Sequence, residues 1–124
     1  MKLQRDLNIG QNVVTAIGEG YVDINGLRQT SSLLILPGQL RTNWGLAGFE
    51  ALTTEDFRPV IELGCEILLF GTGRRQRFPP PALLRELMAA RIGVEVMDTG
   101  AACRTFNILV AEGRNVAATL LIEP

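Results

Sequence analysis

Two short runs of this sequence are apolar with no alternation of polar residues, and they constrain the fold more than any other feature. They are "SLLILPG", residues 32–38, and "CEILLFGTG", residues 65–73. A strand with one face in water alternates apolar and polar residues, whereas a strand covered on both faces is apolar throughout. The two runs therefore predict buried strands in a sheet that has other elements packed on both of its faces.

Helix-like patterns alternate with these runs and with two further strand-like segments. The further strands are expected in "VEVMDTG", residues 94–100, and "NVAATLLIEP", residues 115–124. From residue 33 onward the predicted order is strand, helix, strand, helix, strand, helix, strand, with short loops. That alternation favours an α/β fold with a mostly parallel sheet and helices on its faces.

Two of the three predicted helices have readable ends. "PPALLRELMAARIG", residues 80–93, predicts one apolar stripe formed by Leu84, Leu87, Met88 and Ile92, and Gly93 is expected to end this helix. The third helix, in "AACRTFNILVAEG", residues 101–113, is expected to end at its final glycine.

The start of the first helix is less sharply defined. Thr53 and Asp56 have the spacing of a helix-start box, but Pro59 fits only the first turn of a helix. The helix is therefore expected to start at Thr53 or as late as Asp56, and Gly64 is its expected end.

The segment before residue 33 predicts a β-hairpin preceded by an arm. Asn25-Gly26 lies between two extended runs, and this dipeptide tolerates the positive φ angles of a type I′ turn. Residues 1–12 are polar and mixed, which indicates a loosely held arm. The length of 124 residues then predicts a single domain, residues 1–124, in which residues 13–124 form the folded part.

The basic residues of this sequence exclude several kinds of chemistry. The sequence has no histidine, Lys2 is its one lysine, and the remaining basic residues are arginines. Arginine keeps its proton at ordinary pH, so it can bind anions but is a poor general base. Histidine-dependent nucleophilic pairs and histidine-ligated zinc are therefore excluded within this sequence. We expect no metal and no cofactor, and these exclusions favour a non-enzymatic role over an enzymatic one.

Cysteine use, charge and apolar run lengths predict where the protein works. Cys65 and Cys103 lie in apolar surroundings, which is typical of reduced thiols in a reducing compartment. No apolar run reaches the ~20 residues that a membrane-spanning helix needs. The net charge of −1 argues against nucleic acid as a partner. We expect a cytoplasmic protein that binds neither a membrane nor nucleic acid.

The stretch "LLFGTGRRQRFPPP" leaves two interpretations open. In one, the glycine backbone and the three following arginines form an anion cradle beyond the carboxyl end of a strand. In the other, the stretch is a tight turn with solvated arginines, because Pro79, Pro80 and Pro81 carry no N–H group for an anion and the ending of a P-loop is absent.

The stretch "MDTGAACRTF" also allows two interpretations. Asp98 and Thr99 can cap the third helix or hold a ligand. Cys103 is expected near the start of that helix, where the helix dipole and Arg104 would favour a thiolate. Alternatively, Cys103 is a small buried apolar residue on the same helix face as Phe106.

The two stretches share one edge of the sheet if the strands that precede them are parallel neighbours. We call this edge the rim and expect it to bind a protein partner or a small anion. Its candidate residues are Gly71, Thr72, Gly73, Arg74, Arg75, Arg77, Asp98, Thr99, Cys103 and Arg104. The aromatic residues Trp44, Tyr21 and Phe49 are expected to be core or hairpin anchors.

The C-terminal half of the sequence resembles the Mth nine-three-eight-like family, or domain of unknown function four-nine-eight. The resemblance is carried by the Gly-Thr-Gly at 71–73, the Arg-Phe-Pro at 77–79, "VEVMDTGAACRTFN" and "AEGRNVAA". "LLILPG" and the tryptophan at 44 also fit, so that the resemblance extends from about residue 14 to the end.

The resemblance implies a three-layer, single-domain fold with a central mixed sheet, in which an antiparallel last strand is allowed. It implies no established enzymatic activity. Relatives include a mitochondrial assembly factor for respiratory complex I and an adipogenesis-associated protein, which implies that the family acts through protein partners. The leading hypothesis is a non-enzymatic interaction or assembly module. The alternative is a small anionic ligand-binding protein, or a thiol-dependent enzyme that uses Cys103 and the arginine-rich loop.

Overall fold

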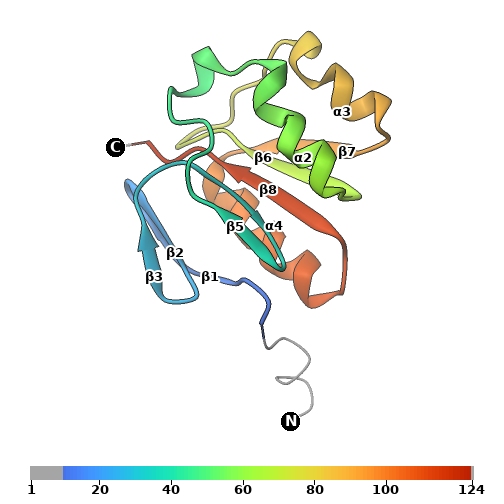
Figure 1. The fold of residues 1–124 in the computed structure, drawn as a ribbon. Helices are drawn as coiled ribbons and strands as arrows, with labels where there is room; N and C mark the ends of the chain where they lie inside the picture. Colours follow the sequence, from blue (N-terminus) through green and yellow to red (C-terminus); the bar gives the residue numbers. More distant parts are fainter. Residues whose placement is uncertain (1–9, 124) are drawn as a thin grey trace.

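The computed structural model describes residues 10–123, which form two sheets and several short helices (Figure 1). The smaller sheet is antiparallel and has the order β1-β2-β3. The larger sheet has the order β5-β4-β8-β6-β7. The strands are β1 (Val14–Gly18), β2 (Tyr21–Ile24), β3 (Leu27–Gln29), β4 (Leu33–Leu36), β5 (Gln39–Arg41), β6 (Ile67–Gly71), β7 (Gly93–Met97) and β8 (Val116–Leu120).

The larger sheet is mixed, and its reversed strand is β4. Strand β6 is parallel to both β7 and β8, whereas β4 is antiparallel to both β5 and β8. The last strand is therefore antiparallel to only one of its two neighbours. Strand β5 was not expected from the sequence; it follows β4 after a tight turn at Pro37 and Gly38, so it must run back alongside β4.

The fold has three layers, and the larger sheet is the middle one. Both of its faces are covered, as the apolar runs predict. On one face lie α2 (Arg58–Leu63) and α3 (Arg85–Ala89), and on the other lie α4 (Thr99–Ala111) and the smaller sheet (Figure 1). Within β4, Leu33 and Ile35 join the core on the α4 side, while Leu34 and Leu36 join the core on the α2 side. The absence of alternation in β4 thus reflects burial on both sides.

The hairpin and the tryptophan are placed as the sequence predicts. Asn25 and Gly26 have φ angles of 54° and 83° and join β2 to β3. Trp44 is buried, and its ring packs edge-on against Phe57 and Phe70. Its Nε1 donates a hydrogen bond to the Asp56 carbonyl oxygen at 2.6 Å.

Of the two starts that the sequence allows for the first helix, the structure has the one at Thr53, and no helix begins with Asp56 as its N-cap. The Thr53 amide donates to the Asp56 carboxylate at 2.7 Å and opens a 3-10 turn over Thr54–Phe57. The α-helix α2 follows directly, with Pro59 in its first turn, where a missing N–H costs nothing. Gly64 caps its end, as predicted.

The predicted apolar stripe of the second helix is partly wrong. A 3-10 turn over Pro81–Leu84 precedes α3, and its tighter winding shifts the buried face relative to a regular α-helix. Leu83 and Leu87 are consequently buried, whereas Met88 is 65% exposed. The helix also ends before Gly93, because Arg91 adopts a positive φ of 63° and lets the Ile92 amide bond back to the Leu87 carbonyl.

The arm predicted for residues 1–12 lies outside the described residues except for its last three. Asn12, the last of them, is well held in the structure. Its backbone N–H donates a hydrogen bond to the Pro37 carbonyl at 2.7 Å, and its side-chain Nδ2 donates to the Leu36 and Gln39 carbonyls. The turn between β4 and β5 is thereby tied to the residues that lead into β1.

Candidate functional site

The loops that follow β6 and β7 meet at one edge of the larger sheet. Gly71 and Met97 are opposite each other in the parallel register of these strands. The Thr72 amide donates to the Met97 carbonyl at 2.9 Å, and the Thr99 amide donates to the Gly73 carbonyl at 2.8 Å. Residues 71–78 and 98–100 therefore share one rim.

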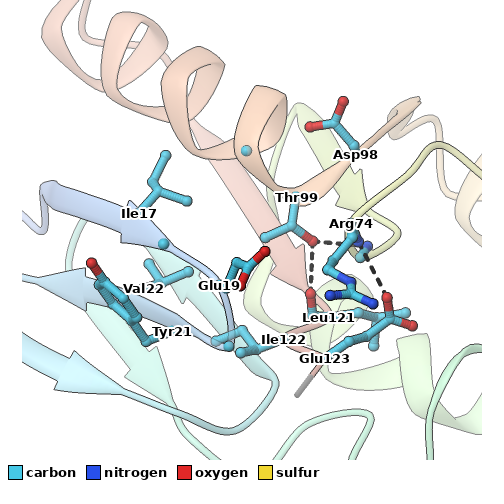
Figure 2. A pocket seen from close by; sticks show the side chains of 14 residues that line it. Ile17, Glu19, Tyr21, Val22, Arg74, Asp98, Thr99, Leu121, Ile122 and Glu123 are labelled. Carbon is cyan, nitrogen blue, oxygen red and sulfur yellow. Dashed lines mark hydrogen bonds between the residues drawn. The ribbon is translucent and has the colours of Figure 1, made fainter.

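Thr99 joins a third segment to this rim. Its buried hydroxyl accepts a hydrogen bond from the Gly73 amide at 2.9 Å and donates one to the Leu121 carbonyl at 2.7 Å (Figure 2). Leu121 belongs to the C-terminal segment, residues 121–123, which reaches the rim because β8 is parallel to β6. The Thr99 hydroxyl is thus fully used in holding the segments together.

Thr72 holds the loop together from its buried side. Its side chain is buried, and its hydroxyl donates to the Arg75 carbonyl at 2.8 Å while accepting from the Arg77 amide at 3.0 Å. These bonds close the loop from residue 72 to residue 77 into a compact turn. Gly71, at the end of β6, is buried as well, with the Thr99 backbone close to it.

Arg77 is fixed in place by three different partners. Its Nε and Nη2 donate to the Thr72 carbonyl at 3.1 and 2.6 Å, and Nη2 also pairs with the Glu123 carboxylate. Its guanidinium carbon lies 4.6 Å from the centre of the Phe49 ring, close enough for a cation–π contact. Arg77 is therefore part of the architecture of the rim.

Glu123 lies against the arginine-rich loop and is held there in ionised form. Burial raises the pKa of Glu123, but the hydrogen bonds from the Arg74 amide and the Arg77 guanidinium, together with the charges of both arginines, lower it below its ordinary value overall. The Arg74 amide nitrogen lies 3.2 Å from Glu123 Oε1.

Three of the predicted arginines remain exposed. Within residues 10–123, the side chains of Arg74, Arg75 and Arg104 form no ion pair with a carboxylate. Arg74, Arg75, Arg77 and Glu123 line an open hollow of about 420 Å³, which we call the arginine hollow. Phe78, the next residue of the loop, is 75% exposed.

Asp98 caps α4. Its Oδ1 accepts a hydrogen bond from the Ala101 amide at 2.8 Å, which satisfies one of the free N–H groups of the helix start. The sequence allows Asp98 either to cap the third helix or to hold a ligand, and in the structure it caps the helix.

The predicted place of Cys103 at the rim is wrong. Cys103 is fully buried in the core on the α4 side, together with Phe106 and Val110. Burial raises the pKa of its thiol from an ordinary value of 9.0 to about 12, which outweighs the lowering by Arg104. Because the helix face that carries Cys103 packs against the sheet, its sulfur is separated from the rim. Cys65 is half-buried, and burial raises its pKa to about 11.

A cavity of about 230 Å³ opens at the rim between the smaller sheet and α4 (Figure 2). We call it the rim pocket. Its charged lining consists of Glu19, Asp98, Glu123 and Arg74, and its apolar lining includes Ile17 and Ile122. The remaining lining residues are Gly18, Gly20, Tyr21, Val22, Gly73, Thr99, Gly100 and Leu121.

Sequence reasoning missed two of the walls of this pocket. The tip of the β1–β2 hairpin carries no signal that would place it beside α4. The C-terminal segment did carry a signal in the sequence. If the last strand is parallel to β6, it ends at the rim, and Glu123 follows directly after it. Only Arg74 of the predicted arginines lines the pocket, so its lining carries more carboxylates than cations.

None of the helices between residues 10 and 123 is long and apolar enough to cross a membrane. In the same part of the chain, no three cysteine, aspartate or glutamate side chains are grouped so that they could hold a metal ion.

Comparison with solved structures shows the same architecture in two bacterial proteins. A crystal structure of a Bordetella parapertussis protein matches with a TM-score of 0.86 at 40% sequence identity, covering 92% of this chain and 98% of that chain. A solution structure from Bordetella pertussis, described as an Mth nine-three-eight-like domain, matches with a TM-score of 0.66 at 32% identity, covering 92% of this chain and 87% of that chain.

Comparison with curated proteins shows a relative with a named role. NADH dehydrogenase (ubiquinone) 1 alpha subcomplex assembly factor 3 of Bos taurus is 35% identical over 124 residues, which covers 98% of this chain and 66% of that protein. This chain thus spans slightly less than two thirds of the length of that relative.

The family profile described as "Protein of unknown function (DUF498/DUF598)" matches residues 14–121. That match includes both sheets, α4 and most of the residues at the rim. The chain therefore belongs to the DUF498/DUF598 family, and its fold is that of the Mth nine-three-eight-like domain.

Proposed function

We propose that this chain is a non-enzymatic interaction or assembly module that binds a protein partner at its rim. The observation that carries the proposal is the similarity, over 98% of the chain, to a protein named as an assembly factor. Because the chain spans 66% of that relative's length, the partner of the relative is not transferred to it. The proposal takes from that relative only the idea that the protein acts by binding another protein.

The chemistry of the rim supports a binding role over a catalytic one. The Thr72 and Thr99 hydroxyls are used in holding the loops, and Asp98 caps a helix. The sequence offers no histidine as a general base. A thiol-dependent enzyme needs an accessible thiolate, and the buried Cys103 argues against that alternative.

The size of the rim pocket favours a side chain of a partner over a free ligand. Pockets for drug-sized molecules usually have volumes of about 300–1,000 Å³. The rim pocket, at about 230 Å³, is smaller and open on one side. One side chain projecting from a protein surface would fill it, with Ile17 and Ile122 against its apolar part.

We further propose that residues 13–124 act as one domain in the cytoplasm. One core includes residues of the smaller sheet, α4 and the larger sheet, which supports a single cooperative unit over the described part of that range. Two free cysteines support a reducing compartment.

A capture experiment with a pocket-filling variant tests the proposed function. Gly100 lines the pocket, has no positive φ, and has only ordinary contacts near the position of a Cβ, so Gly100→Leu adds a side chain at the pocket wall without backbone strain. The matched control is Gly38→Leu in the β4–β5 turn, which is at the opposite edge of the sheet and has open space around it.

Proteins cross-linked to the wild-type chain in cells of the source organism would be identified and quantified for each variant. We expect Gly100→Leu to reduce recovery of at least one specific protein, with Gly38→Leu resembling wild type. Recovery that is the same for wild type, Gly100→Leu and a variant with Arg74, Arg75 and Arg77 all changed to glutamate would contradict a partner at the rim.

A further inference from the structure

The arginine hollow already contains a bound carboxylate, and that carboxylate belongs to the chain itself. Glu123 accepts a hydrogen bond from the Arg74 amide and pairs with the Arg77 guanidinium (Figure 2 shows Glu123 beside Arg74). Gly73, whose φ is 103°, brings the loop backbone so close that a Cβ there would collide with the Glu123 carboxylate. The loop is thus shaped to receive a carboxylate group.

The hollow carries more positive charge than Glu123 neutralises. Its three arginines face one glutamate, and the side chains of Arg74 and Arg75 form no ion pair within residues 10–123. The whole chain has a net charge of −1, so this excess is local. Guanidinium groups bind carboxylates through paired N–H donors, which makes arginine well suited to acidic side chains.

The same loop offers an apolar contact next to these charges. Phe78 is 75% exposed, and Pro79 follows it directly. Arginine and aromatic side chains are enriched among the residues that contribute most to protein interfaces.

We propose that the arginine hollow binds an acidic segment of a protein partner, whose carboxylates pair with Arg74 and Arg75 and replace Glu123 in its contacts. This inference rests on the proposed function for the existence of a partner, and it adds the chemistry of that partner. Glu123 acts in it as an internal competitor, which occupies the site in the free chain and leaves when a carboxylate of the partner arrives.

Neighbouring charges favour an acidic protein segment over a nucleic acid. The rim pocket adjoins the hollow through Arg74 and Glu123, and its lining adds Glu19 and Asp98. A nucleic acid carries a phosphate at every residue and would bring some of them against these carboxylates. A peptide can present carboxylates to the arginines and neutral residues elsewhere.

Binding of a labelled hexaglutamate peptide, followed by fluorescence anisotropy at about 0.1 M salt, where the Debye length is about 10 Å, tests the inference. Arg74→Glu with Arg75→Glu should weaken binding by about tenfold or more, because two charge-assisted contacts become repulsive. The control is Arg91→Glu with Arg114→Glu, which changes the net charge equally at the opposite edge of the sheet. It should stay within about twofold of wild type, because salt screens charges that far away.

The Glu123→Gln variant tests the internal competitor. Removal of the competing charge should tighten peptide binding by about threefold, since partly exposed ion pairs of this kind are weak. Unchanged or weaker binding by Glu123→Gln would overturn the competitor role. The variants should keep the circular dichroism spectrum of wild type, because all the changed side chains are at least partly exposed.

Other outcomes overturn the partner class. Equal losses in the two double variants would mean that only the net charge matters. Tighter binding of a six-nucleotide single strand than of the peptide, with the same dependence on Arg74 and Arg75, would point to nucleic acid. Equal competition by free glutamate at matched carboxylate concentration would point to a small anion. If the peptide fails to bind while Gly100→Leu still abolishes partner recovery, this inference fails and the proposed function stands.

Discussion

The Gly73 amide nitrogen lies 2.9 Å from the Thr99 hydroxyl oxygen, although 26 residues separate them in the sequence. The same hydroxyl donates to the Leu121 carbonyl at 2.7 Å. One side chain thus joins the loop after β6, the start of α4 and the C-terminal segment. The rim depends on this junction, because all three segments line the rim pocket.

Thr99→Val should destabilise the protein, because valine has the same shape but cannot make either bond. The Gly73 amide and the Leu121 carbonyl would be left without their partner in a buried position. We expect the free energy of unfolding to fall by about 1–3 kcal/mol, measured by urea denaturation. The control is Thr105→Val on the same helix, at a half-buried position. Equal losses in both variants would contradict the junction.

Gly73→Ala should destabilise the protein through both backbone strain and a collision with Glu123. Its φ is 103°, and an added Cβ would meet the Glu123 carboxylate. We expect a loss of about 1–3 kcal/mol in unfolding free energy. Gly113→Ala, with a φ of 77° and nothing near the added Cβ, should show backbone strain alone and lose about 1 kcal/mol.

A double variant separates the two causes. Adding Glu123→Ala to Gly73→Ala should restore part of the lost stability, since the collision is removed while the strain remains. A purely additive result in the double-mutant cycle would contradict the close approach of the loop backbone to Glu123.

The buried thiol of Cys103 should make stability fall at alkaline pH. Burial raises its pKa from 9.0 to about 12, so that above pH 9 the unfolded chain loses the proton while the folded chain keeps it. This contribution is therefore fully present below pH 9 and is lost as the pH rises toward 12. Unfolding free energies measured between pH 8 and 11 should fall more steeply for wild type than for Cys103→Ala.

Thiol labelling provides an independent check on Cys103. In the folded protein at pH 8, Cys103 should react with a thiol reagent far more slowly than in the unfolded protein, because it is inaccessible and protonated. The half-buried Cys65 serves as the internal comparison and should react faster than Cys103. Rapid labelling of Cys103 in the folded state would restore the thiol-enzyme alternative.

Asn107→Asp should loosen the smaller sheet from α4. The Asn107 side chain accepts from the Val14 amide at 2.9 Å and donates to the Val14 carbonyl at 2.8 Å, as a neighbouring strand would. Aspartate keeps the acceptor, loses the donor and adds charge beside a carbonyl oxygen. We expect faster amide hydrogen exchange across β1 and β2, with the five-stranded sheet unaffected. Asn43→Asp, the same change at an exposed site, should leave exchange unchanged.

Local patterns in the sequence predicted the elements that depend on neighbouring residues. The unbroken apolar run over Leu33–Leu36 indicated a strand covered on both faces, and Asn25-Gly26 indicated the turn between β2 and β3. Thr53 and Asp56 indicated a helix start. These predictions are correct because backbone preference and burial periodicity act over a few residues.

Local patterns failed where a residue's surroundings come from distant segments. Met88 has helical spacing but is exposed, because a preceding 3-10 turn rotates the helix against its neighbours. For Cys103 the sequence left two interpretations open, a thiolate near a helix start and a buried residue on the face of Phe106, and the packing of α4 makes the buried one correct. In both cases the direction of the side chain depends on how a whole helix is packed.

The sequence alone therefore determined the α/β class, the buried strands and the loops that carry the arginines. The tertiary structure alone decided that β8 is parallel to β6 while β4 is reversed, and hence that Glu123 reaches the arginine hollow. It also placed the β1–β2 hairpin against the start of α4 as a wall of the rim pocket. The physical reason is that strand direction and sheet packing arise from contacts between segments far apart in the chain, which no local pattern encodes.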